Sequence, residues 1–307
     1  MATKKSKTSN KSSKAKTTKP KTATKTAAKT ELEAPKTKTV EEKTTTEKKG
    51  IFKDFFSRKY EEKESILTIF KEPRFYGALL GEAIGTMFLT LLFFSLFLMG
   101  IANVATYGFA IIAILIAVYA FSGACLNPII AVGLMSTRRI SVIRGIMYII
   151  AEVVGAWFAW LIFNGFHLAG GETAYDIPAM SAIAENGFWP IAMVELLGGV
   201  IIAFFFSRAL KYRRSALTFG AVIAGGMALA VVTGYVASAA FLSANNNFIF
   251  NPASALMLQI FPTAGESFGE ILGGICQALS AYAIIPMVGG VVGFYLSDFT
   301  SRLSGEE

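Results

Sequence analysis

Six apolar stretches, each about as long as a bilayer is thick, decide what this chain can fold into. A helix needs about 20 mostly apolar residues to cross the hydrocarbon core of a membrane. The stretches lie at about 76–99, 107–124, 144–165, 189–208, 217–240 and 271–296. The whole chain is 53% hydrophobic and only 16% charged, which is typical of membrane proteins rather than soluble domains. The sequence therefore predicts an all-α membrane protein with six transmembrane helices.

The net charge of +8 is concentrated at the N-terminus. Residues 1–50 contain fifteen Lys and five Glu but no Phe, Trp or Tyr. Such a segment cannot bury enough apolar surface to offset its chain entropy, so we expect a disordered, Lys/Thr-rich cytoplasmic tail. Residues 51–75 mix apolar and charged side chains at helical spacing, and we expect them to lie in the membrane interface. Two partners suit the basic tail, anionic lipid and nucleic acid; the alternative is a solvated tail without a partner.

The basic residues of the membrane region predict its orientation. All eight Lys and Arg residues beyond residue 75 follow the second or fourth span or lie at the C-terminus, namely Arg138, Arg139, Arg144, Arg208, Lys211, Arg213, Arg214 and Arg302. The loops on the other side contain acidic residues and no Lys or Arg. Cytoplasmic loops carry an excess of basic residues. We therefore expect a multi-pass protein of the cell membrane with both termini cytoplasmic, residues 298–307 forming a short C-terminal segment.

The two halves of the membrane region resemble each other. The run "GEAIGTMFLTLLFFSLFL" in the first span parallels "VELLGGVIIAFFFSRAL" in the fourth. Each has a Glu followed three residues later by a Gly, at Glu82/Gly85 and Glu195/Gly198. Each half then places an Asn-Pro pair after its second span. Because a half with three spans ends on the opposite side of the membrane, the two copies must form an inverted repeat.

The Asn-Pro pairs occur in charge-free surroundings, in "SGACLNPII" and "FNPASAL". Asn is a strong N-cap residue, and Pro suits the first position of a helix. About ten residues without a breaker follow each pair, at 127–136 and 251–260, which is too short to span a membrane. We therefore expect two re-entrant half-helices that meet at the midplane by their N-termini. Each N-terminus carries roughly +0.5 charge, so the meeting point repels cations.

Two buried glutamates have an expected role in this arrangement. Glu82 and Glu195 are costly inside lipid unless they are paired. We expect them to support the two loops by accepting backbone N–H groups of the irregular residues before each Asn. The Asn oxygen caps its helix, and we expect the Asn NH₂ group to remain free to contact a passing solute.

With these features in place, residues 76–297 resemble the aquaporin and aquaglyceroporin family of major intrinsic proteins. The resemblance implies an hourglass bundle of six spans and two half-helices, a homotetramer, and passive conduction of water or small uncharged solutes. It places six residues at the pore midplane, namely Asn127, Pro128, Ile129, Asn251, Pro252 and Ala253. Exclusion of cations by an Arg or by half-helix dipoles is an established property of such pores. Two departures stand out, since the family usually has Ala at Ile129 and often has Gln at Glu152.

The resemblance also implies an outer constriction, and here the chain departs further. Counting from the two boxes gives Tyr107 from the second span, with Phe248 and Ser254 from the second loop. Most members have Arg at the position of Ser254, and neither 145–207 nor 215–301 contains a Lys or Arg that could replace it. The residue from the fifth span is left open. Ungapped counting gives Ala239, whereas matching "LAVVTG" to the helix gives Gly234 and implies an insertion near "SANNNF".

An aromatic wall of Tyr107 and Phe248 opposite Ser254 suits the CH backbone and the hydroxyls of a polyol. We therefore expect a passive channel for glycerol-like polyols and water. A water-selective pore, a pore that leaks cations, a secondary transporter with an inverted repeat, and a scaffold that acts through its tail are the alternatives. The chain has one His and no pairing of a nucleophile with a base, so no enzyme, catalytic residue, cofactor or metal site is expected.

Overall fold

The computed structural model describes residues 69–95, 104–171, 187–212, 214–241, 248–258 and 267–305. The expected tail and most of the expected interfacial segment lie outside these residues, so the following concerns only the unit that begins at Gly50. Six helices in the described ranges are long and apolar enough to cross a membrane. The prediction of six spans is therefore confirmed.

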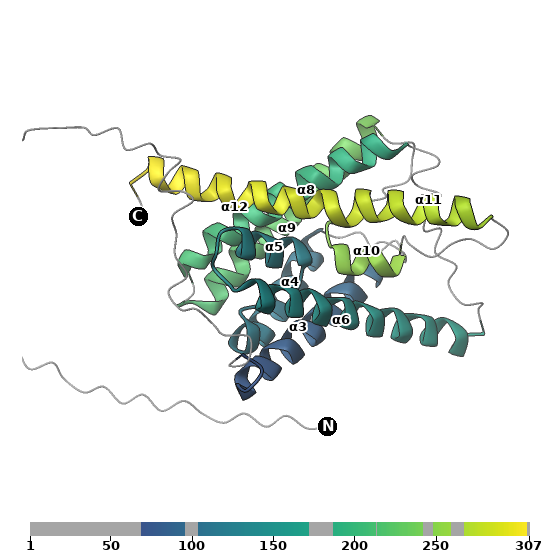
Figure 1. The fold of residues 1–307 in the computed structure, drawn as a ribbon. Helices are drawn as coiled ribbons and strands as arrows, with labels where there is room; N and C mark the ends of the chain where they lie inside the picture. The colour runs from purple at the N-terminus through teal and green to yellow at the C-terminus, as the bar shows by residue number, and fades with distance from the viewer. Residues whose placement is uncertain are drawn as a thin grey trace, which may run out of the picture. The chain divides into compact units, whose positions relative to one another are not determined.

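The helices run in the order that the sequence predicts (Figure 1). The spans are α3 (Pro73–Phe93), α4 (Val104–Ser122), α6 (Val142–Ala169), α8 (Phe188–Ala209), α9 (Ala216–Phe241) and the continuous run of α11 (Phe268–Leu279), η3 (Ser280–Ile284) and α12 (Ile285–Leu303). A single 3₁₀ turn, Leu210–Tyr212, follows α8. Two short helices, α5 (Pro128–Ser136) and α10 (Pro252–Leu258), begin at the prolines of the two Asn-Pro pairs.

The last span differs from a regular helix over 271–296 in two places, before α12 and at its C-terminal end. It contains a π-helical turn, η3, in which the Ile285 N–H donates to the Ser280 carbonyl five residues earlier. Pro286 follows at once, and because proline clashes with the carbonyl four residues before it, a widened turn accommodates it. The helix also continues to Leu303, past the expected end at 296. Polar residues near this end find partners on neighbouring elements, which allows the helix to continue.

The contacts between helices repeat in the two halves. α3 packs on α4 and α6, and α8 packs on α9 and α12 in the same way. The two halves meet through α4 and α9. Each short helix contacts the third span of both halves, since α5 packs on α6 and α12 while α10 packs on η3 and α6. The all-helical inverted repeat that the sequence predicts is therefore present.

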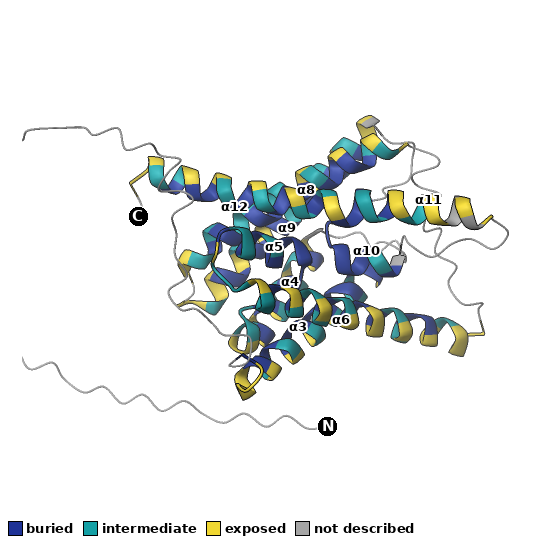
Figure 2. Ribbon diagram, viewed as in Figure 1, coloured by how far each residue is buried: buried dark blue, intermediate teal, exposed yellow. Residues whose placement is uncertain are grey.

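The spans carry many exposed residues along their length (Figure 2), and a large share of them are apolar. Many of these exposed side chains are large, including Phe109, Phe121, Phe166, Trp189 and Val236. Soluble monomers rarely expose contiguous apolar surface on this scale. Lipid is the natural solvent for this surface, and the chain is an integral, multi-pass membrane protein.

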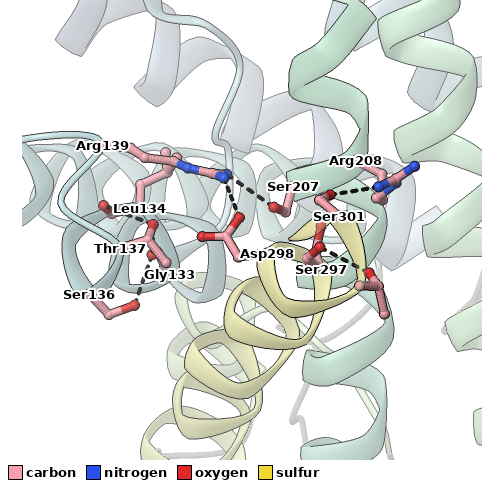
Figure 3. Close-up of polar contacts among 11 residues, drawn as sticks. Gly133, Leu134, Ser136, Thr137, Arg139, Ser207, Arg208, Ser297, Asp298 and Ser301 are labelled. Carbon is pink, nitrogen blue, oxygen red and sulfur yellow. Dashed lines mark hydrogen bonds and ion pairs between the residues drawn. The ribbon is translucent and has the colours of Figure 1, made fainter. Parts of the chain in front are cut away.

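A polar cluster fixes the C-terminal end of α5 against two spans (Figure 3). Arg139, just beyond α5, donates to Asp298 of α12 at 2.6 Å and to Ser207 of α8 at 3.0 Å. The Arg139 guanidinium also lies 5.4 Å from the ring centre of Phe294. Next to it, Arg208 donates to Ser301 at 2.7 Å. Because Asp298 is buried and charge-paired, this cluster holds the short helix at a defined place in the bundle.

Candidate functional site

Both Asn-Pro pairs form capped helix starts at the centre of the bundle. The Asn127 Oδ1 atom accepts the Ile129 N–H at 3.0 Å. The Asn251 Oδ1 atom accepts the Ala253 N–H at 3.0 Å and the Ser254 N–H at 3.4 Å. These bonds satisfy backbone donors that have no partner within a helix. Each Asn therefore acts as the N-cap that the sequence predicts.

The two caps are also joined to each other, which the sequence did not indicate. The Asn127 Nδ2 atom donates to the Phe250 carbonyl at 2.8 Å, and the Asn251 Nδ2 atom donates to the Leu126 carbonyl at 3.1 Å. Each acceptor is the residue before the opposite Asn. The expectation of a free NH₂ group therefore needs correction, because each amide uses one hydrogen across the joint and retains one for a solute. The helix N-termini meet tip to tip.

Two glutamates hold the irregular backbone before each cap. Glu82 accepts the Cys125 N–H at 3.0 Å and the Leu126 N–H at 2.6 Å, one on each carboxylate oxygen. In the other half, Glu195 accepts the Ile249 N–H at 2.6 Å and the Phe250 N–H at 3.1 Å. Glutamate can satisfy two donors at once, and in a buried loop an unpaired N–H would be costly. The spacing of Glu and Asn-Pro in each half is thereby explained.

These bonds stabilise an unusual backbone. Leu126 has φ of 52° and Phe250 has φ of 55°, a left-handed conformation that few residues other than glycine adopt. Such strain persists where the surroundings over-determine the conformation. The left-handed turn directs the Leu126 and Phe250 side chains toward the glycine three residues after each Glu. A Cβ atom at Gly85 would overlap Leu126, and one at Gly198 would overlap Phe250, so both glycines of the repeat are required by a close approach.

A third buried glutamate, Glu152 of α6, lies in one half only. Its Oε1 atom accepts the Asn127 N–H at 3.0 Å. Its Oε2 atom is buried without a hydrogen-bond partner among the described residues. The carboxyl of Glu82 on α3 acts on Glu152, and Glu152 stands where the resemblance to the family often implies Gln.

Two cavities adjoin the joined caps. The Asn251 cavity is lined by Leu89, Phe93, Tyr107, Ile202, Met227, Val231, Phe248, Ile249, Phe250, Asn251 and Ser254. The Asn127 cavity is lined by Leu89, Ile111, Ile114, Leu115, Cys125, Leu126, Asn127, Ile130, Ile202, Phe206, Ile223 and Met227. Leu89, Ile202 and Met227 line both. Leu89 and Ile202 follow Glu82 and Glu195 by seven residues each, a correspondence that could have identified them in advance.

The residues expected at the outer constriction come together around the Asn251 cavity. Tyr107, Phe248 and Ser254 all line it. A Cβ atom at Gly234 would lie 2.9 Å from the Phe248 ring, whereas Ala239 is exposed and lines neither cavity. Of the two residues left open in the fifth span, Gly234 is thus the one beside Phe248. The expected insertion near "SANNNF" lies mostly outside the described residues.

Four residues of the expected midplane set line neither cavity, namely Pro128, Ile129, Pro252 and Ala253. Ile129 is fully buried, and a Cβ atom at Gly290 of α12 would lie 2.8 Å from Ile129 Cγ2. The Ile129 carbonyl oxygen would lie nearer still, at 2.5 Å, so glycine at position 290 leaves space for both the backbone and the side chain of Ile129. Ala253 is also fully buried and lines neither cavity. Pro128 and Pro252, at the first positions of α5 and α10, are buried as well.

The part of the site that sequence reasoning missed is a hydroxyl pair. The Oγ1 atom of Thr90 and the Oγ atom of Ser254 are 2.8 Å apart, from residues 164 positions apart in the chain. No pattern in the sequence pairs them. Among the described residues, no three potential metal ligands gather in one place.

The chain is similar to several known proteins. Residues 69–299 match the family described as Major intrinsic protein. The chain is 25% identical to aquaporin AqpM of Methanothermobacter marburgensis over 197 residues, which span 63% of this chain and 72% of that protein. It is 35% identical to aquaporin-1 of Ovis aries over 81 residues, or 26% of this chain and 30% of that one. A solved structure, that of the aquaglyceroporin from Plasmodium falciparum, aligns with a TM-score of 0.48 at 16% identity, over 74% of this chain and 95% of that chain.

Proposed function

The chain belongs to the major intrinsic protein family and is a passive membrane channel for water or small solutes, and we propose that it conducts glycerol-like polyols as well as water. One observation carries the choice of solute. The Asn251 cavity has the aromatic rings of Tyr107 and Phe248 in its wall together with the neutral polar groups of Ser254 and Asn251. Apolar walls with a few placed polar groups suit a ligand that has both CH surface and hydroxyls.

The absence of a cationic side chain supports a wide rather than a strict filter. Ser254 stands where the resemblance to the family implies Arg, and no Lys or Arg is among the residues that line either cavity. Gly234 adds no side chain opposite Phe248. A small neutral residue at position 254 leaves the cavity without the long side chain that an Arg would place there. Exclusion of cations would then rest on the facing helix N-termini alone, which keeps a cation leak as the outcome to test beside polyol conduction.

A secondary transporter is less well supported than a channel. Transporters of this architecture couple substrate to ions through sites near the midplane. Here Glu82 and Glu195 are engaged on both oxygens by backbone N–H groups. Carboxylates committed to the structure in this way are poorly suited to bind and release an ion in each cycle.

The proposed solute is tested by stopped-flow light scattering on proteoliposomes. Wild type is expected to pass both water and glycerol, and Ser254→Arg is expected to suppress glycerol flux more than water flux, because a long cation would narrow the cavity. Ser304→Arg, at an exposed position at the end of α12, serves as the control and should change neither flux. Water flux without glycerol flux would show a water pore with a neutral filter. Flux of neither solute above that of empty liposomes would contradict the channel proposal for the purified protein.

A thiol reagent tests the path itself. Cys125 lines the Asn127 cavity, whereas Cys276 is exposed on α11. Mercuric ion binds thiolates tightly, so we expect it to abolish most of the water flux of wild type. Cys125→Ser should remove this sensitivity while Cys276→Ser should retain it. Inhibition that follows Cys276 would place the mercury effect outside the Asn127 cavity and argue against this route.

The remaining features of the protein follow the same proposal. We propose the cell membrane as its location, with both termini cytoplasmic, since Arg139 and Arg208 lie at one end of the bundle together and basic residues favour the cytoplasmic side. The homotetramer and the channel domain at 76–297 are carried over from the family as proposals. Contact of the basic tail at 1–50 with anionic lipid or nucleic acid is proposed on charge alone.

A further inference from the structure

We infer that Thr90 is a positioning residue for solute selection, which holds the Ser254 hydroxyl as a neutral donor facing the Asn251 cavity. The inference rests on the proposed polyol conduction and adds the group that would recognise a solute hydroxyl. It begins from the 2.8 Å contact between Thr90 Oγ1 of α3 and Ser254 Oγ in the first turn of α10.

The two hydroxyls differ in their access to the cavity. Ser254 is among the residues that line it, and Thr90 is not. Thr90 is fully buried, whereas its chain neighbour Leu89 and the residue one turn later, Phe93, do line the cavity. Thr90 therefore lies behind Ser254 and cannot touch a solute itself. Any effect of Thr90 on the solute must pass through Ser254.

The number of hydrogens sets the direction of the bond. Two hydroxyls bring two O–H groups, and the bond between them uses one. A buried Thr in a helix commonly donates to the carbonyl four residues earlier, yet among the described residues the Thr90 hydroxyl has no hydrogen bond except that to Ser254. If Ser254 donated, the Thr90 O–H would be buried without an acceptor, at the cost of a lost hydrogen bond. If Thr90 donates, the remaining O–H belongs to Ser254 and faces the cavity, and no buried donor is left unpaired.

Thr90 also prevents an alternative position of the Ser254 hydroxyl. Serine in the first turn of a helix readily bonds to nearby backbone groups. Without the Thr90 hydroxyl, the Ser254 side chain could turn toward the backbone of its own helix and withdraw from the cavity. When the Thr90 hydroxyl is present, the Ser254 hydroxyl accepts a hydrogen bond from Thr90 and can donate one into the Asn251 cavity. A hydroxyl that accepts one hydrogen bond is a stronger donor in the next.

The result is a neutral counterpart to the missing cation. A polyol that passes between the rings of Tyr107 and Phe248 can accept the Ser254 O–H while its CH groups contact the rings. Water can accept the same bond but gains less from the rings. The pair should therefore raise glycerol flux relative to water flux, without the charge repulsion that an Arg would add.

The test compares the ratio of glycerol to water permeability in proteoliposomes for single variants. Thr90→Val keeps the shape of the side chain but removes its hydroxyl. The ratio should fall about fivefold, which corresponds to one hydrogen bond of about 1 kcal/mol. Thr90→Ser, which retains the hydroxyl, should keep the ratio near that of wild type. Thr86→Val is the matched control. Thr86 is buried one turn earlier on α3, its hydroxyl has no hydrogen-bond partner in the part of the chain that the structure describes, and it lines neither cavity.

Combining two variants shows whether Thr90 acts through Ser254. Ser254→Ala should lower the ratio at least as far as Thr90→Val, and adding Thr90→Val to Ser254→Ala should lower it no further, because coupled residues are not additive. Should Thr90→Val fail to fold, Thr90→Ala removes the same hydroxyl without adding bulk.

The outcomes separate the inference from the proposed function. A wild-type protein that passes water but no glycerol would overturn both. A wild-type protein that passes glycerol, with an unchanged ratio in folded Thr90→Val, would overturn the inference alone. An equal loss in Thr86→Val would do the same, since it would show a general effect of hydroxyl removal in α3.

Discussion

Glu195→Gln is expected to destabilise the protein and reduce its permeability, whereas the same change at Glu152 is expected to do neither. Both oxygens of Glu195 accept backbone N–H groups, from Ile249 and Phe250. Glutamine offers one oxygen and an NH₂ group, so one of these donors would face another donor. A buried N–H without an acceptor costs about 1–3 kcal/mol. Permeability should fall as well, because the Phe250 carbonyl accepts from Asn127 in the joint between the caps.

At Glu152 the same substitution replaces an oxygen that lacks a hydrogen-bond partner with an NH₂ group. Only Oε1 accepts a hydrogen bond, from the Asn127 N–H, and Oε2 has no partner among the described residues. The carboxyl of Glu82 also acts on Glu152. Glutamine would keep the bond to Asn127 and bring an NH₂ group to the side where two carboxyls now meet. The unfolding temperature should stay the same or rise.

The measurement is thermal unfolding of the detergent-solubilised protein, followed by tryptophan fluorescence, together with water flux in proteoliposomes. Glu82→Gln provides the third comparison and should behave like Glu195→Gln, since Glu82 also uses both oxygens. If all three variants lose equal stability, the loss comes from the charge and not from the count of accepted bonds, and the explanation above is wrong.

The fold could be predicted from the sequence because the features that determine it are local and occur twice. Span length follows from apolar runs, and capped half-helices follow from Asn beside Pro. The interval from Glu82 to Gly85 recurs at Glu195 and Gly198 because each Glu and each Gly serves the same loop, one through its carboxylate and the other by leaving space. A pattern repeated in order is informative even without any knowledge of contacts.

The rest of the site could not be predicted because it depends on pairs without a pattern. Two ways of counting left Ala239 and Gly234 open for the fifth span, and only the packing of α9 shows that Gly234 is the one beside the Phe248 ring. The bond between Thr90 and Ser254 joins two residues of unremarkable type from different halves. The bonds from Asn127 and Asn251 across the joint depend on both loops having their final shape. Each of these contacts is set by the packing of helices, and no single segment encodes it.

Gly155→Ala is expected to be among the most damaging single-methyl changes in the membrane region. A Cβ atom at Gly155 of α6 would overlap the carbonyl oxygen of Ala83 and lie 2.8 Å from its carbonyl carbon. The neighbour is backbone of α3 and cannot turn aside, so the two helices must separate. Overpacking of this kind costs about 1–3 kcal/mol. Gly165→Ala is the control in the same helix, with nothing within 4 Å of the added atom, and should be neutral or slightly stabilising.

Gly155→Ala is also expected to lower water flux, because the clash lies close to the loop before Asn127. Ala83 follows Glu82, and Glu152 lies one turn before Gly155, so separating α3 from α6 draws two carboxylates apart beneath the loop that ends in Asn127. The other half repeats this geometry, because a Cβ atom at Gly289 would overlap the carbonyl of Leu196, which follows Glu195. Gly289→Ala should therefore lower both unfolding temperature and water flux, as Gly155→Ala does. Loss of stability with normal flux in both variants would mean that the loops keep their shape when the helices move, and that the close helix contacts serve assembly alone.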